Sequence, residues 1–208
     1  MNFLSEKIEF PDVSKTSKEG LLAIGGDLSV KRLILAYKSG IFPWFDDEEP
    51  ILWWSPNPRF VLYPDKLKVS KSMQQILRRK DFVVTTNKAF NEVINECSQV
   101  KRIGQPGTWI TQSMIDAYIS LHKLGYAKSV EVWQNNELVG GLYGVDLNNG
   151  VFCGESMFAK VSNASKVGFI NFIKNSNYKL IDCQVYTQHL ESLGAEEISR
   201  DEFLKYLS

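Results

Sequence analysis

The chain has 208 residues, of which 44% are hydrophobic and 23% are charged, and its 24 basic side chains equal its 24 acidic ones. This length and composition give a buried core in one domain or two modest ones, and they exclude disorder and bulk polycation behaviour. The charge is uneven along the chain, because residues 1–58 carry −3, residues 59–102 carry +6 and residues 103–208 carry −3.

The basic segment contains a run of cations with no carboxylate between them, namely Lys66, Lys68, Lys71, Arg78, Arg79 and Lys80. Such a run is typical of a surface that meets phosphates. It is also typical of a solvated helix face, which on charge alone is the commoner case.

The sequence contains no signal for a membrane or an exported compartment. No stretch approaches the ~20 apolar residues of a membrane span, and the start lacks a basic leader followed by an apolar run. The three cysteines, an odd number at wide spacings, indicate neither a disulfide framework nor a zinc site. We therefore expect a cytoplasmic protein with no membrane contact and no bound metal.

The first quarter of the chain predicts an irregular start, one helix and a stiff loop. The helix begins after Asp27 or Ser29 and ends at Gly40. Residues 41–58 combine four prolines with three tryptophans, which predicts an aromatic loop rather than a helix or a central strand. Its rings could plug the core or face a ligand.

The rest of the chain predicts a mixed α/β (α+β) domain. We expect helices over residues 70–80, 88–98, 111–123 and 162–174, strands over 82–85, 129–134, 137–147, 151–158 and 179–185, and short αβ pieces over 189–207. A strand, two helices, a three-stranded meander, a helix and a strand follow in the order of the GNAT acyltransferase fold. We predict a GNAT-like domain over residues 61–208 and a small N-terminal α+β domain over residues 1–60.

Polar side chains on two of these strands are candidates for chemistry. Asp182 and Gln184 share one face of their strand, and Glu155 and Met157 share a face of theirs. Asp182 lies in an apolar run, where it is either a paired structural residue or part of a site. Because neither histidine neighbours a recognisable nucleophile, the pattern favours a site that positions an amine against an activated acyl group.

A CoA-dependent N-acetyltransferase is the alternative that such a fold suggests. Its pyrophosphate binds backbone N–H groups of a glycine-rich loop that precedes a helix. Residues 159–166, AKVSNASK, contain no glycine, which disfavours close approach of the backbone to a diphosphate. A non-catalytic RNA-binding module is a third possibility, and it would tolerate Asp182→Ala and Gln184→Ala.

Nine motifs resemble the leucyl/phenylalanyl-tRNA–protein transferase family, and they cover the chain from about residue 20 to residue 207. They are GLLAIGGDL (20–28), GIFPWF (40–45), PILWWSP (50–56), GTWI (107–110), SVEVW (129–133), LVGGLYG (138–144), GESMF (154–158), NASK (163–166) and LIDCQ (180–184). The resemblance implies transfer of Leu or Phe, and less well Met, from Leu-tRNA or Phe-tRNA to the α-amino group of proteins that begin with Lys or Arg. It places the enzyme in the N-degron pathway without cofactor, ATP or metal, and we expect a monomer.

The same resemblance implies a role for each site residue. Trp44 and Trp109 flank the terminal adenosine of the tRNA, while Leu142, Phe152, Met157 and Phe172 form the aminoacyl pocket. Glu155 and Asp182 bind the cationic acceptor, and Asp182 polarises the Gln184 amide, which accepts a hydrogen bond from the attacking amine. Proton transfer through the tRNA ribose hydroxyl is a competing route. The basic run then has a partner, since Lys71, Arg78, Arg79 and Lys80 would bind tRNA phosphates.

Overall fold

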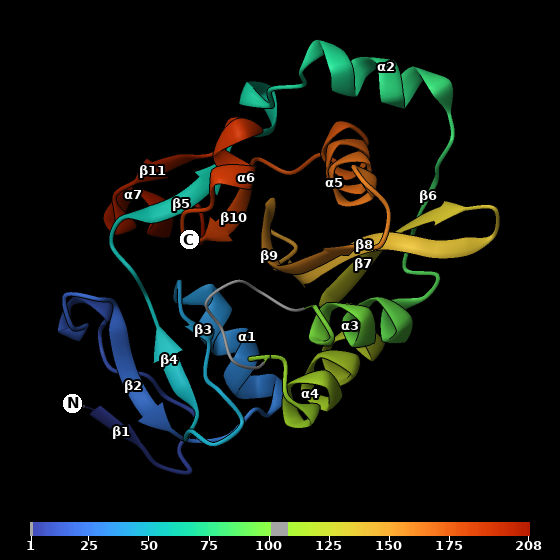
Figure 1. Ribbon diagram of the computed structural model, residues 1–208. Helices are drawn as coiled ribbons and strands as arrows, with labels where there is room; N and C mark the ends of the chain where they lie inside the picture. The colour runs from blue at the N-terminus through green and yellow to red at the C-terminus, as the bar shows by residue number, and fades with distance from the viewer. Residues whose placement is uncertain (1, 101–107) are drawn as a thin grey trace.

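A computed structural model describes residues 2–100 and 108–208, which form two sheets with helices packed against them (Figure 1). The first sheet has the strand order β1-β2-β4-β3. Its elements are β1 (Asn2–Leu4), the 3₁₀ turn η1 (Val13–Lys15), β2 (Leu21–Gly25), α1 (Val30–Lys38), β3 (Phe42–Pro43) and β4 (Leu52–Trp54).

The predicted helix of this first part is confirmed. Helix α1 begins after Ser29, whose hydroxyl accepts a hydrogen bond from the amide of Arg32, so Ser29 rather than Asp27 is the cap. It ends at Lys38, and Gly40 follows with a φ of +73°, a conformation that glycine adopts without strain.

Two predictions for the N-terminal part are wrong. Its start is not irregular, because β1 pairs in parallel with β2. The segment 41–58 is not all loop, because β4 is an internal strand between β2 and β3. Pro50, Pro56 and Pro58 lie outside the strands, and Pro43 lies on the edge strand β3, so none of the four prolines is in an internal strand.

The second sheet has seven strands in the order β11-β5-β10-β9-β8-β7-β6. Strands β9 and β10 run parallel and the other neighbours run antiparallel. The predicted meander is confirmed, whereas β5 was not predicted from the sequence. The strands are β5 (Arg59–Leu62), β6 (Val83–Thr86), β7 (Ala127–Gln134), β8 (Glu137–Asp146), β9 (Val151–Ala159), β10 (Leu180–Gln184) and β11 (Glu196–Ile198).

Helices cover both faces of this sheet. Helices α3 and α4 pack on one face, and α5 packs on the other, where α2 lies outside it (Figure 1). Gly168 lets α5 approach β7 closely, since a Cβ atom there would lie 2.7 Å from a methyl group of Val132. The helices are α2 (Lys71–Arg79), α3 (Phe90–Ser98), α4 (Gln112–Lys123), α5 (Ala164–Lys174), α6 (Gln188–Ser192) and α7 (Arg200–Leu204), with the 3₁₀ turn η2 at Pro64–Lys66.

The two parallel strands separate where the site lies. Strand β10 pairs with β9 only from Leu180 to Asp182, while β9 continues to Ala159 along β8. A shared apolar core joins the two sheets, with Phe42 and Trp53 from the first sheet and Tyr143 from the second. The mixed α/β class and the expected order of elements are confirmed. Within the two described ranges, no helix is long and apolar enough to cross a membrane.

Candidate active site

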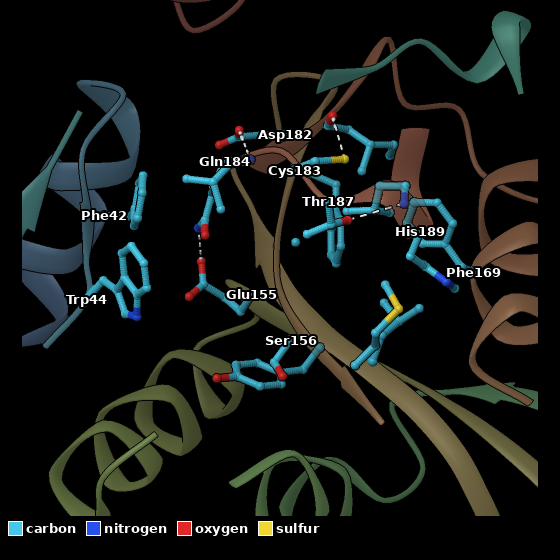
Figure 2. A pocket seen from close by; sticks show the side chains of 18 of the residues that line it. Phe42, Trp44, Glu155, Ser156, Phe169, Asp182, Cys183, Gln184, Thr187 and His189 are labelled. Atoms are coloured by element: carbon cyan, nitrogen blue, oxygen red, sulfur yellow. Dashed lines mark hydrogen bonds between the residues drawn. The ribbon is translucent and has the colours of Figure 1, made fainter. Parts of the chain in front are cut away.

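A cavity of about 490 Å³ opens between β3 and the separated ends of β9 and β10. Figure 2 shows Phe42 and Trp44 on one side of it, Phe169 and His189 on the other, and Glu155 and Gln184 between them. Most of the residues predicted for the site line this one cavity, namely Trp44, Trp109, Leu142, Phe152, Glu155, Met157, Asp182 and Gln184.

The Glu155 carboxylate is the centre of a hydrogen-bond network that joins four elements. The hydroxyl of Tyr37, from α1, donates to Oε1 at 2.7 Å, and that of Tyr118, from α4, donates to Oε2 at 3.0 Å. The Gln184 amide also donates to Oε1, at 2.7 Å. The two tyrosines contact each other through their hydroxyls. Three donors thus fix the carboxylate, and neither tyrosine was identified from the sequence.

Burial controls the ionisation of this network. Burial raises the pKa of Glu155 to about 8. The nearby charge of Asp182 also raises this pKa, whereas the three hydrogen bonds lower it. Burial and the adjacent Glu155 also raise the pKa of Tyr37 and of Tyr118, so both phenols stay protonated at neutral pH. Around pH 8, Glu155 therefore changes between a neutral acid and an anion.

Gln184 lies at the end of β10 in an unusual backbone conformation. Its φ is +64°, in the left-handed region that residues other than glycine rarely occupy, and the register between β10 and β5 shifts at this point. The turn directs the side-chain amide to Glu155. The amide nitrogen of Gln184 donates to Glu155, so the amide oxygen is the atom that can accept a hydrogen bond from a substrate.

Asp182 is buried and has a cation of its own, which differs from the expected contact with a substrate cation. Arg59 binds it through both oxygens, with Nε to Oδ1 at 2.8 Å and Nη2 to Oδ2 at 2.7 Å. Oδ1 also accepts the main-chain N–H of Gln184 at 2.9 Å. Asp182 thus contacts the backbone of Gln184, while the Gln184 side chain is polarised by Glu155. The pairing requirement for a buried carboxylate is met by Arg59.

The aromatic wall of the cavity comes from the loop after β3 and from the segment before α4. The indole N–H of Trp54 donates to the carbonyl of Trp44 at 2.7 Å, and the two ring centroids lie 5.8 Å apart. This fixes the loop after β3. Trp44 and Trp109 are both partly exposed and both line the cavity, so each is accessible to a ligand there.

The apolar wall includes three of the four residues expected for the aminoacyl pocket. Leu142, Phe152 and Met157 line the cavity. Phe172 instead lies behind Phe152, with ring centroids 4.7 Å apart, and faces a separate polar hollow. Phe169, one helical turn earlier on α5, takes the expected place in the cavity. Helical periodicity alone does not show which of two phenylalanines three residues apart points inward.

Two further side chains line the cavity that were not assigned to the site from the sequence. Burial lowers the pKa of His189, and nearby Lys166 adds to the effect, so its imidazole is neutral at pH 7. Burial raises the pKa of the Cys183 thiol, which therefore stays protonated and is a poor nucleophile. This chemistry favours direct attack by a substrate amine over a covalent enzyme intermediate.

The expected phosphate contacts lie apart from the cavity. Lys71, Arg78 and Arg79 are exposed on α2, which lies on the outer side of α5 (Figure 1), and Lys80 follows as the helix cap. Arg79 forms an ion pair with Asp81 at 2.9 Å. These cations therefore lie on the surface, on the outer side of α5.

The cavity brings together an amide, a carboxylate, an apolar slot and two tryptophans, an arrangement suited to transfer of an acyl group to an amine. Residues 61–208 match the family described as leucyl/phenylalanyl-tRNA protein transferase, and residues 26–57 match its N-terminal domain. The chain belongs to this family and is an aminoacyltransferase.

Curated proteins with that name are similar to this chain over its whole length. The leucyl/phenylalanyl-tRNA–protein transferase of Flavobacterium johnsoniae is 62% identical, over 100% of this chain and 99% of its own length. Those of Flavobacterium psychrophilum and Christiangramia forsetii are 59% and 54% identical, each over 100% of this chain and over 99% and 100% of their own lengths. A solved GCN5-related N-acetyltransferase from Kribbella flavida covers 78% of this chain and 58% of its own, with 10% identity and a TM-score of 0.39. That distant likeness carries no information on activity.

Proposed function

We propose that the enzyme transfers Leu or Phe, and less well Met, from aminoacyl-tRNA to the α-amino group of proteins that begin with Lys or Arg. The product would carry a large apolar first residue, which is the signal read by the N-degron pathway. The observation that supports this most is the pairing of Glu155 with Gln184 inside a cavity that has one apolar and one aromatic wall.

Glu155 supplies the charge for the acceptor. Glu155 is a half-buried residue that lines the cavity, and the three hydrogen bonds use only part of the accepting capacity of its carboxylate. An ionised Glu155 attracts the guanidinium or ammonium group of an N-terminal Arg or Lys. Because Asp182 is neutralised by Arg59, we assign acceptor binding to Glu155 and give Asp182 a supporting role.

Gln184 orients the attacking amine. A free α-amine has a pKa of roughly 7.7 to 8, so part of it is neutral at pH 7 and needs orientation more than a strong base. The Gln184 oxygen accepts a hydrogen bond from one N–H of the substrate α-amine, and the lone pair of that amine nitrogen attacks the ester carbonyl of the aminoacyl-tRNA. The new C–N bond replaces the C–O bond to the tRNA ribose, whose oxygen leaves with the proton that the amine loses. The donor ester is already activated, so no cofactor is consumed.

The aminoacyl end of the donor tRNA binds between the aromatic wall and the apolar wall of the cavity. Trp44 and Trp109 stack on the terminal adenine, an interaction worth about 1 to 3 kcal/mol per base that needs no base-edge contact. Leu142, Phe152 and Met157, together with Phe169, receive the aminoacyl side chain. An unbranched apolar slot accepts Leu, Phe and Met, whereas Ile and Val would clash near Cβ.

The basic helix α2 extends the donor site. Lys71, Arg78, Arg79 and Lys80 contact acceptor-stem phosphates, which positions the tRNA without reading its sequence. Selection among tRNAs then comes from the amino acid that each tRNA carries. We place this reaction in the cytoplasm, where charged tRNA is made, and we expect one chain to be sufficient.

A transfer assay with several charged tRNAs tests the proposal. Labelled Leu-tRNA, Phe-tRNA, Met-tRNA and Val-tRNA are each incubated with a peptide that begins with Arg. We expect label in the peptide from the first two, less from Met-tRNA and none from Val-tRNA. Transfer from none of them by folded protein would exclude the proposal. Acetylation of the same peptide from acetyl-CoA would favour the alternative, which the glycine-free segment 159–166 disfavours.

A further inference from the structure

Arg59 is a buried arginine beneath the site, and it was not identified from the sequence. It is the first residue of β5, and only 1% of it is exposed. Taking a guanidinium group out of water is costly, and the cost is recovered only by close pairing and by hydrogen bonds to its remaining donors. The contacts of Arg59 therefore show what it is used for.

These contacts join four parts of the fold at one planar group. Two N–H groups bind the Asp182 carboxylate on β10 in the bidentate manner described above, and a third donates to the carbonyl of Gly40 at 3.2 Å. The guanidinium also stacks between two rings. Its carbon lies 4.8 Å from the ring centre of Phe42 on β3 and 4.6 Å from that of Phe203 on α7.

Two of these partners are directly connected to the reacting groups. Asp182 accepts the main-chain N–H of Gln184 and so supports the left-handed turn that points the Gln184 amide at Glu155. Phe42 lines the cavity two residues before Trp44. Arg59 thus lies behind both the amide proposed to orient the amine and the strand that directly precedes Trp44, a proposed adenine-stacking residue.

We propose that Arg59 is a positioning residue that fixes the Gln184 amide relative to the Trp44 side of the cavity, so that the acyl-transfer rate depends on its planar, two-pronged geometry. The inference rests on the function proposed above and deepens it. Lysine offers a point charge on a flexible stem, and it can neither bind a carboxylate with two parallel bonds nor stack between two rings. Rates of this kind are sensitive to small displacements of the reacting groups.

Stability alone is a weak reason for this pair. Replacing a buried ion pair by apolar side chains of similar size is often neutral or stabilising, whereas removing one partner is strongly destabilising. A core that needed only to fold could therefore have an apolar pair at these two positions. The pair instead bonds to the backbone of a residue in a strained conformation, at the point where β10 leaves its regular register.

The test compares Arg59→Lys with a matched control, Arg32→Lys. Arg32 is equally buried and is also paired with an aspartate, Asp27, but it lies on α1 and does not line the cavity. Thermal unfolding of each variant is measured first, and assays are run at a temperature where both are fully folded. The assay is transfer of Leu from Leu-tRNA to an Arg peptide, with kcat and the KM for the peptide determined separately.

We expect Arg59→Lys to lower kcat at least tenfold. The KM for the peptide should stay within twofold of wild type, because Glu155, which is proposed to bind the peptide, keeps its hydrogen bonds to Tyr37 and Tyr118. Arg32→Lys should leave kcat within twofold even if it loses as much thermal stability. The double variant Arg59→Met/Asp182→Leu, an apolar replacement, should fold and also lose kcat, and it replaces the single variant if Arg59→Lys does not fold.

A wild-type kcat in Arg59→Lys, or in the folded double variant, would overturn the inference. So would an equal loss of kcat in Arg32→Lys, because that would show a general effect of losing a buried arginine. If wild-type protein transfers no Leu at all, the proposed function fails instead, so the two failures are distinguishable.

Discussion

If Glu155 binds the acceptor as proposed, its ionisation should make acceptor binding depend on pH, and one substitution should abolish that dependence. The relevant perturbation is Glu155→Gln, which keeps the size of the side chain but cannot carry charge. Its single amide oxygen replaces only one of the two carboxylate oxygens that accept from Tyr37 and Tyr118. If Glu155 binds the cation of an N-terminal arginine, only its anionic form does so strongly. The pH dependence of binding then reports the pKa of this one carboxyl.

The size of the effect follows from a pKa raised to about 8. About one-tenth of the carboxyl groups are ionised at pH 7 and about nine-tenths at pH 9. Since the pKa is raised, the anion is present above pH 8 and lost below it, so affinity rises with pH. The apparent affinity for a cationic acceptor should increase about tenfold between pH 7 and pH 9 in the wild-type protein.

The assay must separate this effect from titration of the attacking amine. We would use a desamino-arginyl peptide, which has the guanidinium but no α-amine, as a competitive inhibitor, with a citrulline peptide as the uncharged control. The inhibition constant should fall about tenfold from pH 7 to pH 9 for the wild type. It should stay flat for Glu155→Gln and for the citrulline peptide. A flat wild-type profile, or the same slope in Glu155→Gln, would refute the role of Glu155.

Three further predictions concern the donor and the fold. Trp109→Ala should raise the KM for Leu-tRNA about 5- to 150-fold, the equivalent of 1 to 3 kcal/mol of stacking, while Trp133→Ala, outside the cavity, should change it less than twofold. Arg78→Glu/Arg79→Glu should weaken tRNA binding and reduce the slope of log affinity against log salt by about 1 to 2. The control variant Lys88→Glu/Lys123→Glu changes two exposed cations, one just before α3 and one on α4, and should leave that slope unchanged. If the slope were also unchanged in the α2 variant, the cations of α2 would be solvated surface residues that do not contact tRNA. Gly168→Ala should destabilise the fold by about 1 to 3 kcal/mol in urea unfolding, because its Cβ would lie 2.7 Å from a Val132 methyl, and a wild-type midpoint would contradict the close packing of α5 on β7.

Local signals were sufficient for the longer elements of the fold. The caps Ser29, Ser70 and Thr111 begin helices where the sequence predicts them, and each accepts a hydrogen bond from the third residue that follows. The asparagine turns join the meander strands as expected. The short strands β1, β4 and β5 were not predicted because three or four residues carry little periodicity, and their pairing partners lie far away along the chain.

The site was only partly readable for a related reason. Strand alternation placed Glu155 and Met157 together on the cavity side, and both line it. Asp182 received a different partner because Arg59, which binds it, is 123 residues away and lies on a strand that no local pattern revealed. Tyr37 and Tyr118 resemble ordinary core residues on two helices, and only the folded structure shows that their hydroxyls meet at Glu155.

Under the proposed function, a neutral α-amine next to a cationic side chain receives the aminoacyl group in this cavity. Its most direct test is competition among four peptides that differ only in a first residue of Arg, Lys, citrulline or Glu. They are mixed in equal amounts with Leu-tRNA and wild-type protein, and the products are identified by mass spectrometry. We predict one added leucine at the N-terminus of the Arg and Lys peptides and almost none on the other two. Equal leucylation of the citrulline peptide, or leucine attached only at side-chain amines, would contradict the account.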